Sequence, residues 1–485
     1  MKKVLCIVLV LLMLFPMMMS CKKEEEAPVV SDTEVVESTL PEGDGNLLDT
    51  IPSAVYGGKQ FLISCQGEHE YEFTAEELNG DIANDTLYKW ISLINDRYGV
   101  SVESRVPDGE FYEAQAVETT SGMVETSLYA HNAFQLYMPV MAGLYKNWND
   151  MGSMIDLNAP RWDQEINNAS TYNGILYGLS GQLSISKMLY AMATFYNVGL
   201  LDEIGYDVEY LYQLVDDGEW TLDMLEMITK DMYVDGNRDR KKDMDDTFGY
   251  LSRSGNSLDI WITQLNMSIT SRDSANTITP TLYNEQNVEI LKRLCEFYYN
   301  NAGIACIEGH TDENTTEAEA FRDGVAAMVT CRFSRATMFA EMGVESFGIL
   351  PGVKLNKDQP DYYTGLHDRY AIYGVSKSIL EEDRDFIAHI TDALCAESSQ
   401  TVYPQYYDVL LKQRYSKDPD TARMVDLIMK NVRFDTAFQF GKHLDMYPYM
   451  VRELIMANNP NLASAYGGIA TSLPGKLQEV YNAYK

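Results

Sequence analysis

Oxygen-bearing side chains recur at close spacing between Asp235 and Asp246. They occupy positions 1, 3, 5, 9 and 12 of a loop, and this spacing allows side chains and one backbone carbonyl to surround a hard cation. Carboxylates gathered so closely repel one another unless a cation lies between them. The segment therefore predicts a structural Ca²⁺ site with the following ligands: Asp235, Asn237, Asp239, the Lys241 carbonyl, Asp243 and Asp246.

The spacing is similar to that of EF-hand and dockerin loops, with two departures. Arg240 stands where those loops have a glycine at the sharp turn, and Asp246 is shorter than the customary bidentate glutamate. A solvated acidic surface turn is the alternative interpretation. Neither interpretation makes the segment catalytic.

The remaining chemistry-bearing residues do not form the motif of a known enzyme class. The six histidines are scattered, without the HExxH spacing of a catalytic metal site. The sequence contains neither a GxSxG nucleophile elbow nor a phosphate-cradling glycine loop. Glycoside hydrolysis by a pair of carboxylates stays an alternative. It is an unspecific one, because any two of the 72 acidic residues could lie close together in the fold. We therefore expect a protein that is not an enzyme and has no organic cofactor.

Alternating strands and helices must position any binding site in this chain. The chain has 485 residues, enough for two lobes. Residues 59–65 and 100–106 have the pattern of strands, and residues 85–98 between them have helical spacing. This order predicts a βαβ unit and a largely parallel sheet, with ligands at the carboxyl ends of its strands. Helices are also expected at 222–232, 288–300, 317–323 and 385–395, strands at 326–330 and 347–350, and a hairpin turn at Asn173-Gly174.

Charge and composition restrict the partners. The formal net charge of −34 repels polyanions, so nucleic acid and anionic lipid headgroups are poor partners, and neutral or cationic ligands fit better. The 33 tyrosines offer flat apolar faces with a hydroxyl, a combination that suits sugars and peptides.

The first residues have the features of an export signal. Residues 1–20 combine a basic start with an apolar run too short to span a bilayer. The junction Met18-Met19-Ser20-Cys21 resembles a bacterial lipobox, in which the cysteine is lipidated; an ordinary cleaved signal with an incidental cysteine is the alternative. Residues 21–55 are acidic and poor in aromatic residues, which predicts a flexible tether. We therefore expect a lipoprotein at the extracytoplasmic face of a bacterial membrane, contacting the membrane through its lipid alone.

Five cysteines follow the tether, and none has the CxxC spacing of a zinc site. Their odd number and scattered positions do not indicate a disulfide framework. We expect mostly buried thiols, and one bridge stays open as an alternative. The five are Cys65, Cys295, Cys306, Cys331 and Cys395.

Five phrases of the sequence, in register, resemble the extracellular solute-binding proteins of the sugar-binding type, the capture components of ABC transporters. They are residues 79–85 (NGDIAND), residues 172–179 (YNGILYGL) with Phe195-Tyr196-Asn197, residues 217–222 (DGEWTL), residues 321–328 (FRDGVAAM) and residues 347–354 (FGILPGVK). Trp220 and Gly324 within them are expected to serve the fold and to make no ligand contact.

The resemblance implies an α/β, two-lobed periplasmic-binding-protein-like fold (type II), with central mixed sheets flanked by helices. Lobe 1 would comprise residues 56–184 plus 361–407, and lobe 2 residues 185–360 plus 408–485. The implied protein is a monomer that captures a carbohydrate, in particular an oligosaccharide, between its lobes by hinge closure and delivers it to ABC permease subunits. A receptor for a peptide or another polar solute is one alternative, and a surface glycan-adhesion lipoprotein without a permease is another.

The resemblance also implies which segments line the cleft. These are the turn before the first helix, the two crossings between lobes and the end of the strand after Met328. Trp261 is the expected stacking platform, because an aromatic face packs well against the C–H face of a sugar. The expected hydrogen-bonding groups are Asn84, Asp85, Gln182, Ser184, Arg332, Tyr363, His367 and Asp368.

Overall fold

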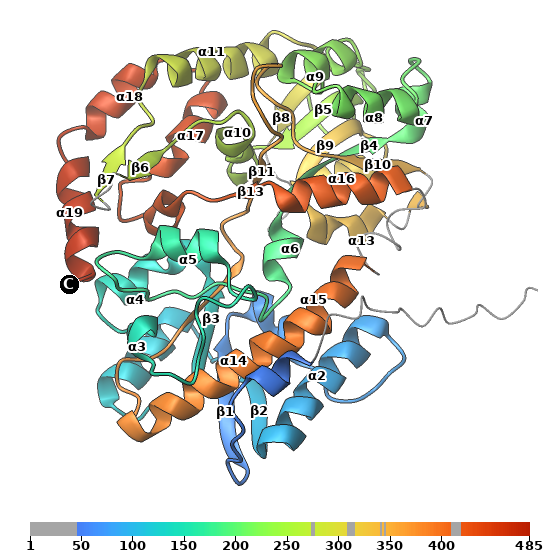
Figure 1. The fold of residues 1–485 in the computed structure, drawn as a ribbon. Coiled ribbons are helices and arrows are strands. Elements are labelled where there is room, and N and C mark those ends of the chain that lie inside the picture. Colours follow the sequence, from blue (N-terminus) through green and yellow to red (C-terminus); the bar gives the residue numbers. More distant parts are fainter. Residues whose placement is uncertain (1–45, 273–276, 308–315, 340–341, 344–345, 409–418) are drawn as a thin grey trace, which may run out of the picture. The chain divides into compact units, whose positions relative to one another are not determined.

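Two β-sheets organise the chain in the computed structural model (Figure 1). The structure describes residues 46–272, 277–307, 316–339, 342–343, 346–408 and 419–485. These residues fall in one compact unit, Gly45–Lys485. The predicted signal, Cys21 and most of the predicted tether lie outside the described residues. In the part of the chain that is described, no helix is long and apolar enough to cross a membrane.

The first sheet has the strand order β12-β3-β1-β2. Strand β1 (Lys59–Cys65) pairs in parallel with β2 (Val100–Arg105) and β3 (Leu128–Asn132), while β12 (Ala371–Gly374) runs antiparallel to β3. The predicted βαβ unit is therefore confirmed. Helix α2 (Ile82–Tyr98) connects β1 to β2 and begins before the expected Asp85, because the Asp81 carboxylate accepts from the Asn84 N–H and caps the helix. Helices α3 (Phe111–Ser121) and α14 (Arg384–Gln400) complete this part of the unit.

The second sheet has the order β10-β4-β9-β5-β8. Strands β5 (Phe248–Arg253), β8 (Ile304–Ile307) and β9 (Ala326–Arg332) are parallel, and β4 (Met192–Asn197) runs antiparallel to β9 and to β10 (Phe347–Leu350). The helices of this part include α7 (Val198–Asp202), α8 (Val208–Asp216), α9 (Leu222–Thr229), α10 (Ile260–Gln264), α11 (Glu285–Tyr299), α12 (Thr316–Arg322), α13 (Ala336–Phe339) and α16 (Pro419–Lys430). Each expected helix and strand is present, with ends that match the predicted ones or differ from them by a few residues.

Short elements connect the two sheets. Helix α6 (Ser186–Tyr190) precedes β4, and its residues bond to the return crossing: the His367 N–H donates to the Tyr190 carbonyl (3.0 Å), and the Ala371 N–H donates to Ser186 Oγ (2.8 Å). On that crossing, β11 (Thr364–Gly365) pairs with β13 (Val432–Arg433). Figure 1 draws α6 between the two sheets. The exact lobe boundaries stay a prediction.

Side chains that form hydrogen bonds between different elements stabilise the fold. The indole of Trp90 on α2 donates to the Leu394 carbonyl of α14 (3.0 Å), and that of Trp220 donates to the Pro351 carbonyl (2.9 Å). At Asn173-Gly174 both residues have positive φ, as a type I′ turn requires, although only one isolated bridge flanks the turn. Cys65, Cys295, Cys331 and Cys395 are buried free thiols, and Cys306 is half-buried and free.

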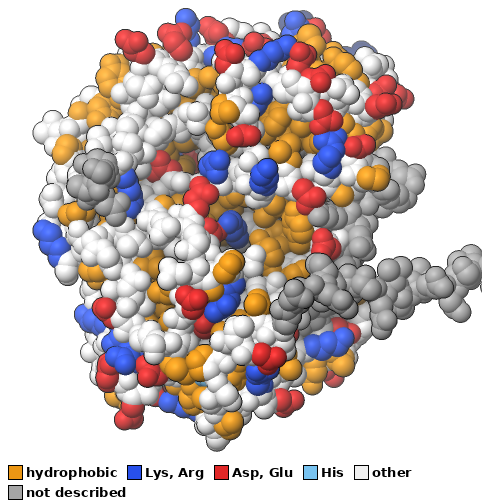
Figure 2. Space-filling view, viewed as in Figure 1, with side chains coloured by type: hydrophobic (Ala, Val, Ile, Leu, Met, Phe, Trp, Pro, Cys, Tyr) orange, Lys and Arg blue, Asp and Glu red, His pale blue; other side chains and the backbone are white. Residues whose placement is uncertain are grey.

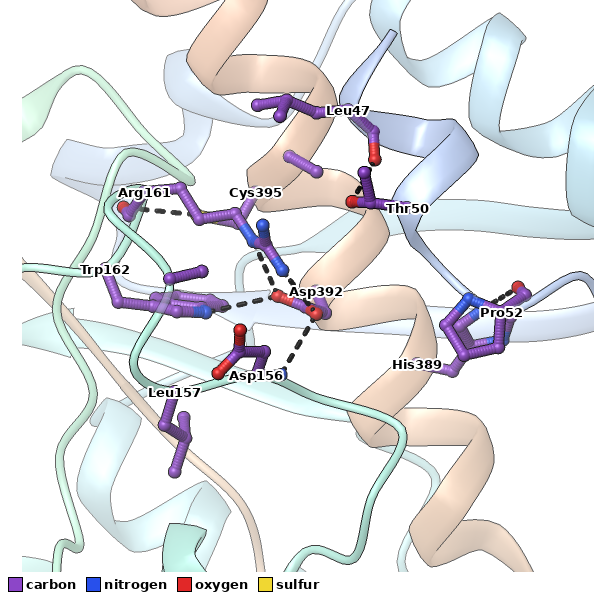
Figure 3. A network of polar contacts seen from close by, with 12 residues as sticks. Leu47, Thr50, Pro52, Asp156, Leu157, Arg161, Trp162, His389, Asp392 and Cys395 are labelled. Carbon is purple, nitrogen blue, oxygen red and sulfur yellow. Dashed lines mark hydrogen bonds and ion pairs between the residues drawn. The ribbon is translucent and has the colours of Figure 1, made fainter. Parts of the chain in front are cut away.

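Residues before the predicted end of the tether at residue 55 already pack against the folded unit. Leu48 and Ile51 are buried, and the Leu47 N–H donates to Gln400 of α14 (2.8 Å). The Pro52 carbonyl bonds to His389 Nε2 on the same helix (2.7 Å; Figure 3). The prediction was wrong here because a few apolar residues in an acidic stretch are enough to pack against a helix provided by distant sequence.

A buried ion pair joins α14 to the segment before the first crossing (Figure 3). The Asp392 carboxylate accepts from Arg161 Nε and Nη2 (both 2.7 Å), from the Trp162 indole (3.1 Å) and from the Asp156 N–H (3.2 Å). The Arg161 carbonyl in turn accepts from the Gln182 N–H (2.9 Å). This network fixes the chain where it leaves the first sheet.

Candidate ligand-binding cavity

Two adjoining cavities lie where strands of both sheets end. Asn256 and Asp368 line both of them. The larger has a volume of about 260 Å³, and Phe134, which follows β3, lines it together with Arg253 at the end of β5. Ligands of parallel α/β sheets bind at this edge because the loops after the strands converge there. The other residues around the larger cavity are Gly255, Arg369, Lys442, Met446, Tyr449, Arg452 and Glu453, and Figure 2 shows basic and acidic side chains side by side on one face of the molecule.

The carboxylate of Glu68, just after β1, accepts hydrogen bonds from side chains in three other parts of the chain. Arg369 Nη1 lies 3.2 Å from its Oε2, the Tyr190 hydroxyl donates to the same oxygen (3.5 Å), and the Asn132 amide donates to Oε1. Asn132 is the last residue of β3, so the first sheet, the first crossing and the return crossing meet at one carboxylate. Such a carboxylate is held in place by charge-assisted hydrogen bonds.

Behind Glu68 lies a buried histidine. His69 Nδ1 is 2.6 Å from Glu72 Oε1, and Nε2 is 3.1 Å from Asn132 Oδ1. Burial alone would lower the pKa of His69, but the neighbouring carboxylates of Glu72 and Glu68 outweigh it, so the pKa is raised. His69 and Glu72 are both fully buried. The pair therefore supports the loop that carries Glu68 and is not accessible to a ligand.

His367 lines the smaller cavity and is neutral. Its Nε2 lies 3.0 Å from the Asn256 amide nitrogen, and its Nδ1 accepts from the Arg369 N–H (3.3 Å). Burial, followed by the positive charges of Arg332, Arg369 and two further arginines, holds the pKa of His367 well below its usual value. A neutral imidazole in this place offers hydrogen bonds without adding charge.

Asp368 is next to His367 and faces an aromatic hydroxyl. Tyr449 Oη donates to Asp368 Oδ2 (2.9 Å), and the guanidinium of Arg452 lies 4.2 Å from the Tyr449 ring centre. Burial raises the pKa of Asp368, although the Tyr449 hydrogen bond and nearby arginines oppose the shift. Phe134 has Arg369 and Lys442 within 6 Å of its ring centre, at 5.9 and 5.8 Å. The cavity thus combines ring faces, carboxylates and cations.

The structure brings some of the predicted site residues together and leaves others apart. Asp368 lines both cavities and His367 the smaller one. Arg332 is not among the lining residues; it lies over the Tyr190 ring (5.1 Å), and its positive charge acts on His367. Gln182 lines a different cavity of about 400 Å³, with Trp162 and Lys187. Ser184 is buried 3.2 Å from the Ser186 hydroxyl, and Tyr363 lies under Arg433 (5.2 Å).

Asn84 and Asp85 bond to the turn before α2. Asp85 Oδ1 accepts from the Asn79 N–H (2.9 Å), and the Asn84 amide donates to the Glu77 carbonyl (2.8 Å). These bonds lower the pKa of Asp85, the Asn79 N–H being the main cause. Both side chains hold the turn in place, and neither lines a cavity described above.

Trp261 cannot be the stacking platform. Its side chain is 0% exposed and packs against the rings of Tyr250, Phe297 and Tyr298. The indole N–H donates to the Tyr298 hydroxyl (2.9 Å). The prediction failed because the apolar face of α10 turns Trp261 into the core. The ring faces at the cavity come instead from Phe134 and Tyr449. Neither was predicted, because β3, which Phe134 follows, is not among the predicted strands and no motif indicates Tyr449.

In the predicted calcium loop, side chains bond to the loop's own backbone. Asp246, which is 2% exposed, accepts from the Gly236 N–H (3.1 Å) and the Tyr233 hydroxyl (3.2 Å). Asp235 Oδ2 accepts from the Arg240 N–H (3.1 Å), while its buried Oδ1 has no hydrogen-bond partner. Within the described ranges, no group of three or more His, Cys, Asp or Glu side chains is arranged to hold a metal.

Comparison with known proteins bears on the fold. No family model and no curated protein matches the chain. Among solved structures, a solute-binding protein of an ABC transporter from Thermotoga lettingae bound with α-D-tagatose has a TM-score of 0.51 at 12% identity, covering 87% of this chain and 100% of that one. The GacH receptor of Streptomyces glaucescens, solved with acarbose, has a TM-score of 0.53 at 11% identity, with 88% and 100% covered.

A third similar structure is the galacto-N-biose/lacto-N-biose I-binding protein of an ABC transporter from Bifidobacterium longum, with a TM-score of 0.52 at 10% identity, covering 88% of this chain and 98% of that one. At these identities the likeness establishes the fold alone. The chain has an α/β, two-lobed fold of the periplasmic-binding-protein type, with mixed sheets flanked by helices. The fold implied by the sequence resemblance is confirmed.

Proposed function

We propose that this protein is the solute-capturing receptor of an ABC importer and that it takes a carbohydrate, in particular an oligosaccharide, into the cavity at Asn256 and Asp368. The observation that carries the proposal is the position of this cavity. Loops after β3 and β5, from different sheets, line it together, so a bound solute would touch both halves of the fold. The three proteins of similar fold described above were solved with tagatose, acarbose and lacto-N-biose.

The lining supports a sugar as the solute. Phe134 and Tyr449 offer ring faces for the C–H surface of a sugar ring, while Asn256, His367 and Asp368 offer donors and acceptors for its hydroxyls. A solute that contacts both halves favours the arrangement in which they are close, and its extra contacts supply the free energy of closure. The proposal assigns these residues to binding and gives none of them a catalytic role.

A thermal-shift screen of oligosaccharides against peptides tests the proposal. A ligand present at about 100 times its dissociation constant stabilises the folded state by roughly 2.7 kcal/mol. We expect stabilisation by an oligosaccharide, and stabilisation by peptides alone would refute the carbohydrate assignment. Phe134→Ala should weaken the binding of the sugar about tenfold. Tyr283→Ala is the matched control, because Tyr283 is exposed and stacks on Tyr466, which is not among the residues that line the cavity.

We propose that the receptor is held at the extracytoplasmic face of the membrane by lipid on Cys21. The lipobox-like junction and the acidic stretch after it support this. Expression in a Gram-positive host should give a membrane-bound protein, and Cys21→Ser should release it into the medium. Equal partition of both forms would contradict the lipid anchor.

We also propose a structural Ca²⁺ in the loop 235–246. The buried, unpartnered oxygen of Asp235 and the almost fully buried Asp246 support it, since a cation would neutralise both carboxylates. Millimolar CaCl₂ should raise the melting temperature of EDTA-treated protein, and Asp246→Asn should abolish the increase. No increase in the unsubstituted protein would leave the loop as a solvated acidic turn.

A further inference from the structure

Arg332, at the end of β9, differs from the other arginines around the cavity. Arg369 pairs with Glu68 (3.2 Å), Arg253 lies 3.5 Å from Glu317, and Arg452 pairs with Asp259 (2.8 Å). The side chain of Arg332 forms no ion pair or hydrogen bond with any described residue, and its guanidinium lies over the Tyr190 ring at 5.1 Å. A partly buried guanidinium without an anionic partner is costly, because it loses water without gaining a counter-charge.

The surroundings of Arg332 are more positive than the chain as a whole. Burial and then the charge of Arg335 lower the pKa of the Arg332 guanidinium, with Arg369 acting in the same direction, while Tyr190 and the Glu317 carboxylate oppose the shift. Two nearby carboxylates already have partners, because Glu68 forms an ion pair with Arg369 and Glu317 lies beside Arg253. Four arginines, Arg253, Arg332, Arg335 and Arg369, therefore act together on His367 at the strand ends, in a chain whose formal net charge is −34.

Arg332 is also close to the candidate cavity. The Tyr190 ring beneath it lies 5.8 Å from the ring of His367, which lines the smaller cavity, and the Tyr190 hydroxyl donates to Glu68. A group bound by Arg332 would thus be placed beside the hydrogen-bonding groups proposed for the sugar. The positive potential is local, because exposed charges farther away than about 10 Å are screened by salt.

We infer that the captured solute is an anionic saccharide and that Arg332 receives its oxyanion, a carboxylate or a sulfate ester. This rests on the proposed function and narrows it to acidic sugars. The planar guanidinium presents parallel N–H donors that match both oxyanions, and Tyr190 holds it by stacking. The formal net charge argues for neutral or cationic ligands, but binding depends on the local field at the cavity.

An array of neutral, uronate-containing and sulfated oligosaccharides, probed with the full chain, separates the outcomes. Selective binding of acidic sugars supports the inference, and the uronate and sulfate arms identify the oxyanion. Binding of neutral sugars alone overturns the inference while the proposed capture of carbohydrate stands. Binding of none of them overturns both.

Variants of Arg332 then test its assignment with the acidic sugar that binds best. Calorimetry with Arg332→Gln should show affinity reduced about 10- to 100-fold, the range for a hydrogen bond between charged groups, and Arg332→Lys should lose less. The matched control is Arg97→Gln, whose exposed partner Asp49 lies outside the cavity lining. Raising NaCl from 50 to 500 mM should weaken binding to the unsubstituted protein and leave the residual binding of Arg332→Gln less affected.

Equal losses in Arg332→Gln and Arg97→Gln would overturn the assignment of the oxyanion to Arg332. Melting temperatures of both variants check that each is folded. A folded Arg332→Gln protein that binds the acidic sugar with unchanged affinity would reduce Arg332 to a structural partner of Tyr190.

Discussion

Replacing Asp392 with asparagine should destabilise the protein severely, because the carboxylate is the shared acceptor of a buried network. The side chains of Arg161 and Asp392 are 7% and 3% exposed, and Asp392 accepts four hydrogen bonds, two of them from the guanidinium at 2.7 Å (Figure 3). Asparagine removes the negative charge and turns an N–H₂ group toward groups that are all donors. The guanidinium would stay buried without a counter-charge.

The expected loss is about 3–5 kcal/mol of unfolding free energy, the usual cost of breaking a buried ion pair by removing one partner. Folded domains are stable by only about 5–15 kcal/mol, so this change should be easily measured. Urea unfolding followed by tryptophan fluorescence gives the value, provided that the slope with urea is unchanged. Asp385→Asn is the matched control on the same helix, because its pair with Arg384 is exposed and should contribute less than about 1 kcal/mol.

The double substitution Arg161→Met with Asp392→Leu tests the explanation itself. With both charges removed, we expect much of the lost stability to return, because no unpaired charge remains in the core. A loss below about 1 kcal/mol in Asp392→Asn, equal to that of the Asp385 control, would refute the argument. It would show that water reaches the pair and screens it.

Two further substitutions test buried residues. Burial lowers the pKa of His131 to about 4, so the unfolded chain takes up a proton near pH 6.5 that the folded chain does not bind. His131 alone should therefore reduce the free energy of unfolding by about 2 kcal/mol between pH 7 and pH 5. Urea unfolding at both pH values should show a smaller total loss in His131→Gln. His69, whose pKa is raised, and His367 and His389, whose pKa values are lowered, titrate in both proteins, so the difference between the two proteins reports His131. Trp261→Phe should cost about 1–2 kcal/mol through its lost bond to Tyr298, with sugar affinity unchanged by calorimetry. Weakened sugar binding in a stable Trp261→Phe protein would show that Trp261 contributes to the binding site after all.

Local sequence determined most of the secondary structure. Strands 59–65 and 347–350 were found with the predicted bounds, because apolar periodicity and flanking turn residues are local signals. Thr221 caps α9 through its hydroxyl, and Gly99 ends α2 in the left-handed conformation that glycine favours. The helix α2 nevertheless began earlier than its apolar pattern, at the cap provided by Asp81.

The residues of the binding cavity could be predicted only in part, because contacts between distant parts of the chain form the cavity and no local sequence pattern contains them. His367 and Asp368 could be placed there through the resemblance of the chain, since a crossing between lobes lies beside the cleft in that fold. Tyr449 belongs to the C-terminal part and reaches Asp368 across 81 residues of sequence, without a motif to indicate it. Trp261 looked suitable for stacking on a sugar, but residue type alone does not distinguish a ring in a core from a ring at a cavity.

Residue types and their spacing thus determined the fold class, the alternating elements and the scarcity of catalytic motifs, because each follows from neighbours along the chain. Tertiary structure alone decided which charges are paired. Arg253, Arg332 and Arg369 are equally basic in the sequence, yet Glu317 and Glu68 lie beside two of them and leave Arg332 with Tyr190. Pairing depends on distances of a few ångströms between residues far apart in sequence, and folding sets those distances.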